Sequence, residues 1–225
     1  MNESQFNLSI DSLRKVLDYI QFLKGDRFDI NIKRDLRKNK KNTTEYLDLY
    51  SEIINRGDFD FLLLDESIIQ IRYWSDSGTK KARYVFYKVP FDYFSYEEFL
   101  VECGFDYEKV GGEFMEEYEQ ALSERDIIFP FVHTRYDYIE RDYCEGIHPV
   151  SHFHVGNQPI RVSARSLITP YMFAFVVLKQ FYYAEWKKWI KDKKFRDYYN
   201  FSKRSCEEVG ENFWKDLDER ELFLV

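Results

Sequence analysis

The sequence predicts an α+β protein, with an antiparallel or mixed sheet flanked by helices in a single domain over residues 1–225. Two observations predict this class. Apolar residues recur at helical spacing near both ends of the chain, whereas its middle holds the short alternating runs typical of strands. We therefore expect a helical part with a basic loop over 1–57, a sheet with a polar centre over 58–165, and C-terminal helices over 166–225.

Composition and charge narrow the function classes. The net charge of −7 argues against nonspecific coating of DNA, which needs a dense cationic surface, but it leaves room for a local basic patch. The N-terminus lacks the features of a signal peptide, and the longest apolar run, residues 167–178, is too short to span a bilayer. The three cysteines form neither a zinc pattern nor a disulfide framework. We expect a cytoplasmic protein that does not contact a membrane.

The first quarter of the chain predicts two helices around a basic loop. The first helix is expected over 9–25, with Ser9 or Asp11 as its cap and Gly25 as its end, and the second over 43–57. The loop between them is either solvated or a phosphate-contacting patch. Its cations are Lys33, Arg34, Arg37, Lys38, Lys40 and Lys41.

The middle of the chain predicts a meander of strands over 59–64, 67–74 and 83–89, with a hairpin turn at 75–78. Two helices should follow, and the second of them, within 111–126, is strongly acidic. Residues 129–140 alternate again. His133, Arg135 and Asp137 should therefore point from one face of a strand.

All four histidines of the chain lie between residues 133 and 154, and three of them lie in the stretch "HPVSHFHVG". If that stretch is extended, His152 and His154 share one face of a strand. Together with His148, and with Asp137 or Asp142 as a further ligand, they could bind zinc or another transition metal.

Two other interpretations of this stretch stay open. In the first, His148 or His152 moves a proton without a metal, while nearby arginines hold a phosphate. Arg135 precedes the stretch, and Arg161 and Arg165 follow it. In the second, the stretch is structural, and its His148 and Ser151 side chains hydrogen-bond the loop backbone.

Weaker patterns point to two nuclease classes. The spacing of Arg141 and His148 is that of certain helical ribonucleases, although Gly146 and Pro149 disfavour a helix here. A magnesium-dependent nuclease site would draw on residues of the meander. Those residues are Asp65, Glu66, Gln70, Lys80 and Lys81.

The last quarter of the chain predicts helices. Thr169 and Pro170 should begin the first of them, and a final helix is expected within 205–220. Between these helices lies a basic patch interleaved with Trp189, Phe195 and Tyr198. It is either a surface on which single strands stack or an exposed helix with snorkelling lysines. Its cations are Lys187, Lys188, Lys191, Lys194 and Arg196.

Residues 127–186 carry a specific resemblance. A strand reading "FVHTRYDYIE", the motif "HPVSH", an arginine stretch "IRVSARS" and a Thr-Pro helix follow one another in this order. The segment resembles the C-terminal half of the bacterial domain-of-unknown-function family 2290, and the strands at 62–74 and 82–90 resemble its upstream part. The polar positions that the resemblance implies are Arg135, Asp137, His148, Ser151, His152, Gly156, Arg161 and Ser163, together with Pro149.

The chain also departs from the family pattern. Its arginine stretch lacks the family's proline, and the second acidic residue of the strand is displaced to Glu140. The family does not require His154. We therefore expect His154 to lie beside the polar centre as a bystander.

The resemblance implies the company of a helicase, because members are similar to the small partner of a helicase in bacterial anti-phage defence. Our leading hypothesis is a defence-associated nuclease or phosphodiester hydrolase that acts on DNA or RNA, with a divalent metal left open. Its catalytic residues would be Arg135, Asp137, His148, Ser151, His152 and Arg161. The alternative is a non-catalytic sensor or adaptor module that binds a helicase or nucleic acid.

Overall fold

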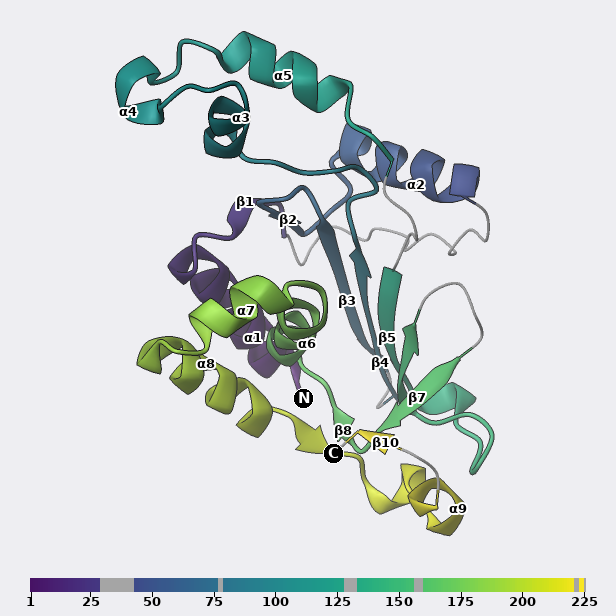
Figure 1. Cartoon of the computed structure of the whole chain (residues 1–225). Coiled ribbons are helices and arrows are strands. Elements are labelled where there is room, and N and C mark those ends of the chain that lie inside the picture. Colours follow the sequence, from purple (N-terminus) through teal and green to yellow (C-terminus); the bar gives the residue numbers. More distant parts are fainter. Residues whose placement is uncertain (29–42, 77–78, 128–132, 156–159, 221–222, 225) are drawn as a thin grey trace.

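The computed structural model describes all residues except 29–42, 77–78, 128–132, 156–159, 221–222 and 225 (Figure 1). An eight-stranded sheet runs through the molecule in the order β1-β2-β3-β4-β5-β6-β7-β10, which confirms the α+β class. Neighbouring strands are antiparallel except β7 and β10. The strands are β1 (Leu23–Asp26), β2 (Phe61–Leu63), β3 (Ile68–Asp76), β4 (Thr79–Tyr87), β5 (His133–Ile139), β6 (Ser151–Val155), β7 (Arg161–Ala164) and β10 (Phe223–Leu224).

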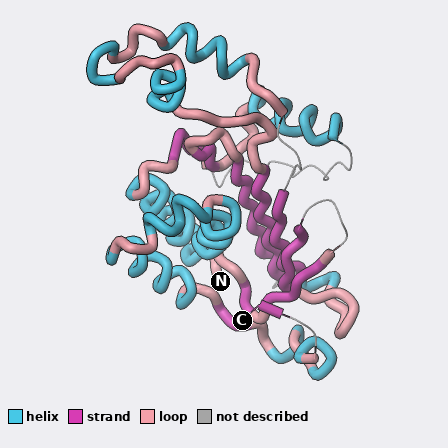
Figure 2. The backbone as a smooth tube through the Cα atoms, in the orientation of Figure 1, coloured by secondary structure: helices cyan, strands magenta, loops and turns pink. Residues whose placement is uncertain are grey.

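The helices are distributed unequally between the two faces of the sheet (Figures 1 and 2). A two-stranded sheet of β8 (Ser166–Leu167) and β9 (Glu207–Glu208) lies beside them. Two short 3-10 turns, Glu140–Asp142 and Glu211–Phe213, complete the fold. The helices are α1 (Glu3–Tyr19), α2 (Thr43–Arg56), α3 (Tyr96–Glu102), α4 (Tyr107–Val110), α5 (Met115–Ser123), α6 (Pro170–Phe181), α7 (Tyr183–Trp189), α8 (Lys193–Arg204) and α9 (Asp216–Glu219).

The inner face of the sheet carries the main core. Alternate residues of the central strands, such as Tyr84, Phe86 and Tyr136, pack against α1 and α6 and are almost completely buried. Thr169 caps α6 through its side chain, with Pro170 at the first helical position, as the sequence predicted. Each such buried side chain contributes about 1.5–3 kcal/mol of hydrophobic stabilisation.

Within the part of the chain that the structure describes, a helix packs on the opposite, outer face of the sheet at one end. There α2 packs Tyr46, Leu49 and Ile53 onto Val85 and Tyr87. Further along the same strands, the outer face changes from apolar to polar residues, and this polar part holds the candidate site.

Three boundaries differ from prediction. Helix α1 begins after Asn2, whose side chain and Gln5 form a reciprocal capping box that we overlooked. The helix ends at Tyr19, so Gly25 lies in β1 and the first 57 residues contribute a strand. The predicted final helix is replaced by β9, a 3-10 turn and the four-residue α9.

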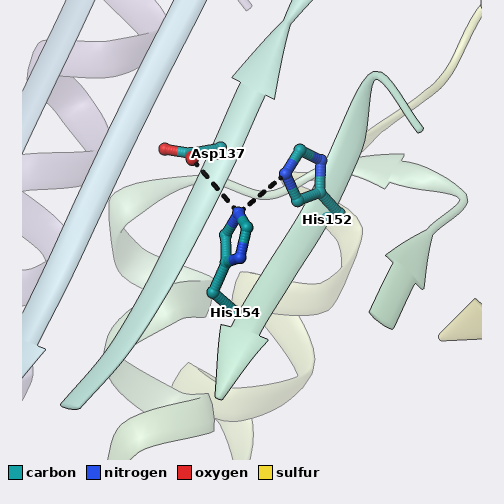
Figure 3. A group of neighbouring side chains, drawn as sticks. All are labelled: Asp137, His152 and His154. Carbon is teal, nitrogen blue, oxygen red and sulfur yellow. Dashed lines mark hydrogen bonds and ion pairs between the residues drawn. The ribbon is translucent and has the colours of Figure 1, made fainter. Parts of the chain in front are cut away.

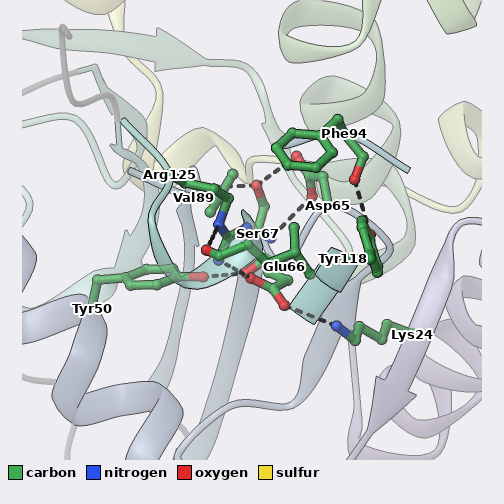
Figure 4. Close-up of polar contacts among 10 residues, drawn as sticks. Lys24, Tyr50, Asp65, Glu66, Ser67, Val89, Phe94, Tyr118 and Arg125 are labelled. Carbon is green, nitrogen blue, oxygen red and sulfur yellow. Dashed lines mark hydrogen bonds and ion pairs between the residues drawn. The ribbon is translucent and has the colours of Figure 1, made fainter. Parts of the chain in front are cut away.

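Helices α3 to α5 form an arm that projects from one end of the sheet (Figure 1). The side chain of Glu66 ties the arm to the rest of the molecule, because it accepts from Lys24 of β1 at 2.9 Å and from Arg125 after α5 at 3.0 Å (Figure 4). Among the described residues, no helix combines the length and the apolar character needed to cross a membrane.

Candidate functional site

The sheet register brings the predicted polar residues into two neighbouring rows on the outer face. In one row, Arg83 pairs with Asp137 and Asp137 with His152. In the next row, Arg135 pairs with His154 and His154 with Arg161. Side chains alternate across a strand, so one face of the four adjacent strands β4 to β7 presents guanidinium, carboxylate and imidazole groups together.

The centre of these rows is a buried triad of Asp137, His152 and His154 (Figure 3). The Nε2 atoms of His152 and His154 are 3.0 Å apart, and His154 Nε2 lies 3.5 Å from Asp137 Oδ2. Water has little access, since the three residues are 2%, 1% and 8% exposed in chain order. The triad therefore offers converging ligand atoms in a nearly dry environment.

A backbone contact fixes the orientation of His152. Its Nδ1 lies 2.8 Å from the carbonyl oxygen of Pro149, which can only accept a hydrogen bond. Nδ1 therefore carries the proton, and the lone pair of Nε2 points at His154. Burial first, and then the nearby His154, lower the pKa of His152 to about 4, so its ring is neutral at physiological pH.

Two arginines compensate the charge of Asp137. Arg83 contacts both carboxylate oxygens, with Nε–Oδ1 at 2.6 Å and Nη2–Oδ2 at 3.3 Å, and Arg135 Nε lies 2.9 Å from Oδ2. Burial alone would raise the pKa of Asp137. The hydrogen bond with His154 and the two guanidinium charges outweigh burial and hold this pKa well below its usual range. Asp137 is therefore ionised at physiological pH.

His148 and Arg161 lie at the edge of the triad. A tight turn holds His148, whose backbone N–H donates to the Cys144 carbonyl at 2.8 Å, and its ring centroid is 5.0 Å from that of His152. The His148 Nδ1 atom is buried without a hydrogen-bond partner. Burial, then the charge of the exposed Arg161, lower the pKa of His148. The His148 imidazole is therefore half-buried beside the triad, with its Nδ1 atom shielded from solvent.

The structure does not bring Ser151 to this centre. Because it alternates with His152, Ser151 faces the inner core, where it is fully buried. Its hydroxyl donates to the Ser166 carbonyl at 2.7 Å and contacts the Tyr136 hydroxyl at 2.9 Å. Ser151 is therefore a packing residue, and its expected position among the catalytic groups is wrong.

The structure also corrects the place of His154. We expected a bystander, but His154 is the central member of the triad, between Asp137 and His152. The strand alternation that paired His152 with His154 was the correct signal, and the family pattern misled the assignment. Sequence reasoning also missed Arg83, which only the pairing of β4 with β5 could have revealed.

The predicted nucleic-acid-binding residues of α7 and α8 lie on the other side of the molecule, in the helical layer that covers the inner face (Figure 1). All five side chains are exposed, but the aromatic rings between them pack within the protein and are not free to stack on bases. Phe195 is fully buried, Trp189 packs against the core, and Tyr198 packs edge-on against Tyr19. The side chains are Lys187, Lys188, Lys191, Lys194 and Arg196. This arrangement matches snorkelling lysines rather than a stacking surface.

The candidate magnesium site of the meander is not assembled. Asp65 accepts a hydrogen bond from the Ser67 hydroxyl near the base of the arm (Figure 4). Its carboxylate also accepts from Lys88 and from the Tyr182 hydroxyl. Lys80 and Lys81 lie at the far end of the β3–β4 hairpin, so no magnesium site forms between them and Asp65. The basic run with Lys33, Arg34, Arg37, Lys38, Lys40 and Lys41 lies outside the described residues, as does Gly156.

The triad has the features of a metal site. Two imidazoles and one ionised carboxylate match the two-histidine, one-carboxylate set that binds divalent transition metals. The contact from His152 Nδ1 to a backbone carbonyl is the outer-shell contact that orients such ligands. The Nε2–Nε2 separation of 3.0 Å is close to that of two nitrogens which each lie about 2.0–2.1 Å from one ion.

Comparisons with known proteins place the chain in a family. The fold and site define an α+β protein with a histidine-rich polar centre on the outer face of its sheet. Residues 17–215 match the family described as "Uncharacterized conserved protein (DUF2290)", and the chain belongs to this family. The family resemblance drawn from the motifs is thereby confirmed. No curated protein and no solved structure matches the chain.

Proposed function

We propose that this protein hydrolyses phosphodiester bonds of nucleic acid with a divalent transition metal held by Asp137, His152 and His154. One observation carries the proposal: a buried triad of ligand atoms shares a sheet face with three arginines, Arg83, Arg135 and Arg161. Such a site combines metal ligands with groups that bind phosphate. The setting in anti-phage defence beside a helicase rests on the family resemblance.

The protonation states favour a metal over metal-free acid–base catalysis. A general base works best with a pKa near the operating pH, and the pKa of His152 is lowered to about 4. The same neutral imidazole beside an ionised carboxylate is ready to bind a cation without losing a proton. A bound metal would supply a hydroxide nucleophile and polarise the phosphate.

The residues around the triad suit the remaining tasks. Arg161 is exposed and can meet an incoming phosphate, whereas Arg83 and Arg135 are about a quarter exposed and already hold Asp137. Their guanidinium groups would stabilise charge that develops on the phosphate oxygens. The half-buried imidazole of His148, next to His152, would carry a proton to or from the leaving oxygen.

Activity and metal binding test the proposal together. We expect the purified chain, assayed with its helicase on single- and double-stranded DNA and RNA, to cleave in Zn²⁺ or Mn²⁺ and to stop in chelator. His154→Ala should abolish both cleavage and metal binding by calorimetry. Arg161→Ala should lower kcat/KM about 100-fold without changing metal affinity. Arg165→Ala, which removes an arginine paired with Glu219, is the matched control.

A second candidate function is a non-catalytic adaptor, and the burial of the site favours it. Asp137 and His152 are almost inaccessible and already have partners within the protein. A structural network would look the same. The adaptor function is supported if His154→Ala and chelator leave phage protection intact while the helicase still binds, and it is refuted if protection requires the triad.

A further inference from the structure

A groove opens on the outer face of the sheet directly beside the triad. Trp74, Lys81 and Ile139 pair across β3, β4 and β5 in the row next to that of Arg83 and Asp137. Two residues along a strand span about 7 Å, so the groove begins one step from the site. Its volume is about 690 Å³, and its lining residues are Trp74, Thr79, Lys80, Lys81, Ile139, Arg141 and Asp142.

The chemistry of the groove combines one aromatic surface with cations. The Trp74 side chain is large yet Trp74 is 39% exposed, an uncommon arrangement for an indole at the end of a hairpin. The Lys81 ammonium lies 5.1 Å from the centre of its ring, and the exposed Arg141 also lines the groove. The lining carries three cations and one carboxylate, whereas the whole chain has a net charge of −7.

We propose that this groove binds a single-stranded segment of nucleic acid, with one base stacked near Trp74 and its phosphates held by Lys81 and Arg141. Aromatic side chains on an open sheet face stack on unpaired bases, and neighbouring cations follow the backbone. The strand would then continue onto the row of Arg83, Asp137 and His152. The proposal rests on the proposed function for the fate of the strand, but binding itself needs no catalysis.

The geometry favours a single strand over a duplex. The bases of a duplex are stacked on one another, so an indole on a sheet face has no free base surface to meet. The acidic chain as a whole repels a polyanion, which restricts contact to a local cationic groove. The groove therefore recognises an unpaired base with its two flanking phosphates, a substrate that a helicase would generate.

Fluorescence polarisation tests the groove without relying on cleavage. The probe is a labelled 12-nucleotide single strand, DNA or RNA, mixed with the full chain in EDTA, with a duplex of the same sequence as competitor. We expect Trp74→Ala to weaken binding roughly tenfold or more and Trp74→Phe to restore most of it, since one stacked base is worth about 1–3 kcal/mol. Lys81→Gln should also weaken binding and lower its salt dependence by about one phosphate contact.

The controls separate this inference from the proposed hydrolysis. Lys109→Gln on the arm should leave binding unchanged, because that exposed lysine is far from the groove in the sequence and the fold. Binding that survives Trp74→Ala, or that is lost only in a variant with Lys187→Gln in α7 and Lys191→Gln between α7 and α8, overturns the groove. The groove proposal is upheld if a His154→Ala variant that cleaves nothing still binds the single strand through Trp74. This result does not depend on the proposed activity.

Discussion

Replacing Asp137 by asparagine tests the ion pairs between this carboxylate and its two arginines. The substitution keeps the size of the side chain, so it creates no cavity, but it removes the charge that two arginines contact at 2.6 Å and 2.9 Å. Breaking a fully buried ion pair by removing one partner typically costs about 3–5 kcal/mol. The guanidiniums of Arg83 and Arg135 are 26% and 21% exposed and can turn partly toward water. We therefore expect a loss of about 2–3 kcal/mol in the free energy of unfolding.

Urea denaturation of the metal-free protein at pH 7.5 measures this loss, and a double-mutant cycle with Arg83→Gln isolates the pair. The sign of the pH dependence is fixed by the lowered pKa of Asp137. Its stabilisation is fully present above the unfolded-state pKa of about 3.9 and is lost as the pH falls further. The gap between wild type and variant should thus be constant from pH 7.5 to about pH 5 and should narrow below about pH 4.

A loss under about 0.5 kcal/mol, or a coupling energy near zero, would refute this reasoning. Either result would mean that Asp137 is not held by its arginines in solution and is poorly preorganised as a ligand.

Two further predictions concern residues around the site. Burial, and then Arg135, lower the pKa of His133 to about 4, so the folded state excludes a proton that the unfolded chain binds below about pH 6.5. Because the buried His133 stays neutral, the free energy of unfolding should fall by about 2 kcal/mol as the pH goes from 7.5 to 5.0. In the His133→Gln variant this fall should be smaller by about the same amount. A fall of unchanged size contradicts the assignment. Ser151→Ala should cost about 1–3 kcal/mol in thermal or urea unfolding, because the Ser166 carbonyl and the Tyr136 hydroxyl lose a buried partner. It should leave metal affinity unchanged, and a loss of metal affinity would return Ser151 to the site.

Local patterns in the sequence predicted much of this fold. Alternation along residues 133–139 placed His133, Arg135 and Asp137 on one face, and the Thr169–Pro170 cap began a helix where expected. The missed elements depend on contacts distant in sequence. Strand β1 exists because it pairs with β2, and the two-residue β10 because it pairs with β7. Neither segment has a local preference for a strand strong enough to predict it from the sequence.

The candidate site divides in the same way. Strand periodicity grouped Arg135 with Asp137, and His152 with His154. The register that joins these pairs and adds Arg83 depends on which strands are neighbours. Ser151 shows the opposite error, since a family position was assigned a catalytic role although alternation turns it toward the core. Membership of the family motif indicates that a residue is important, but it does not say toward which face of the sheet the side chain points.

The outer face itself argues that its polar centre serves more than stability. At one end, β3 and β4 bury the apolar residues Ile68, Val85 and Tyr87 under α2, so these strands can pack their outer face with apolar side chains. A few residues along, these strands and β5 and β6 bury a carboxylate and two imidazoles, for which removal from water is costly. Replacing such groups by apolar residues commonly leaves stability unchanged or improves it. The burial of Asp137, His152 and His154 beside an apolar part of the same sheet is therefore what we expect if, as proposed above, their chemistry is used.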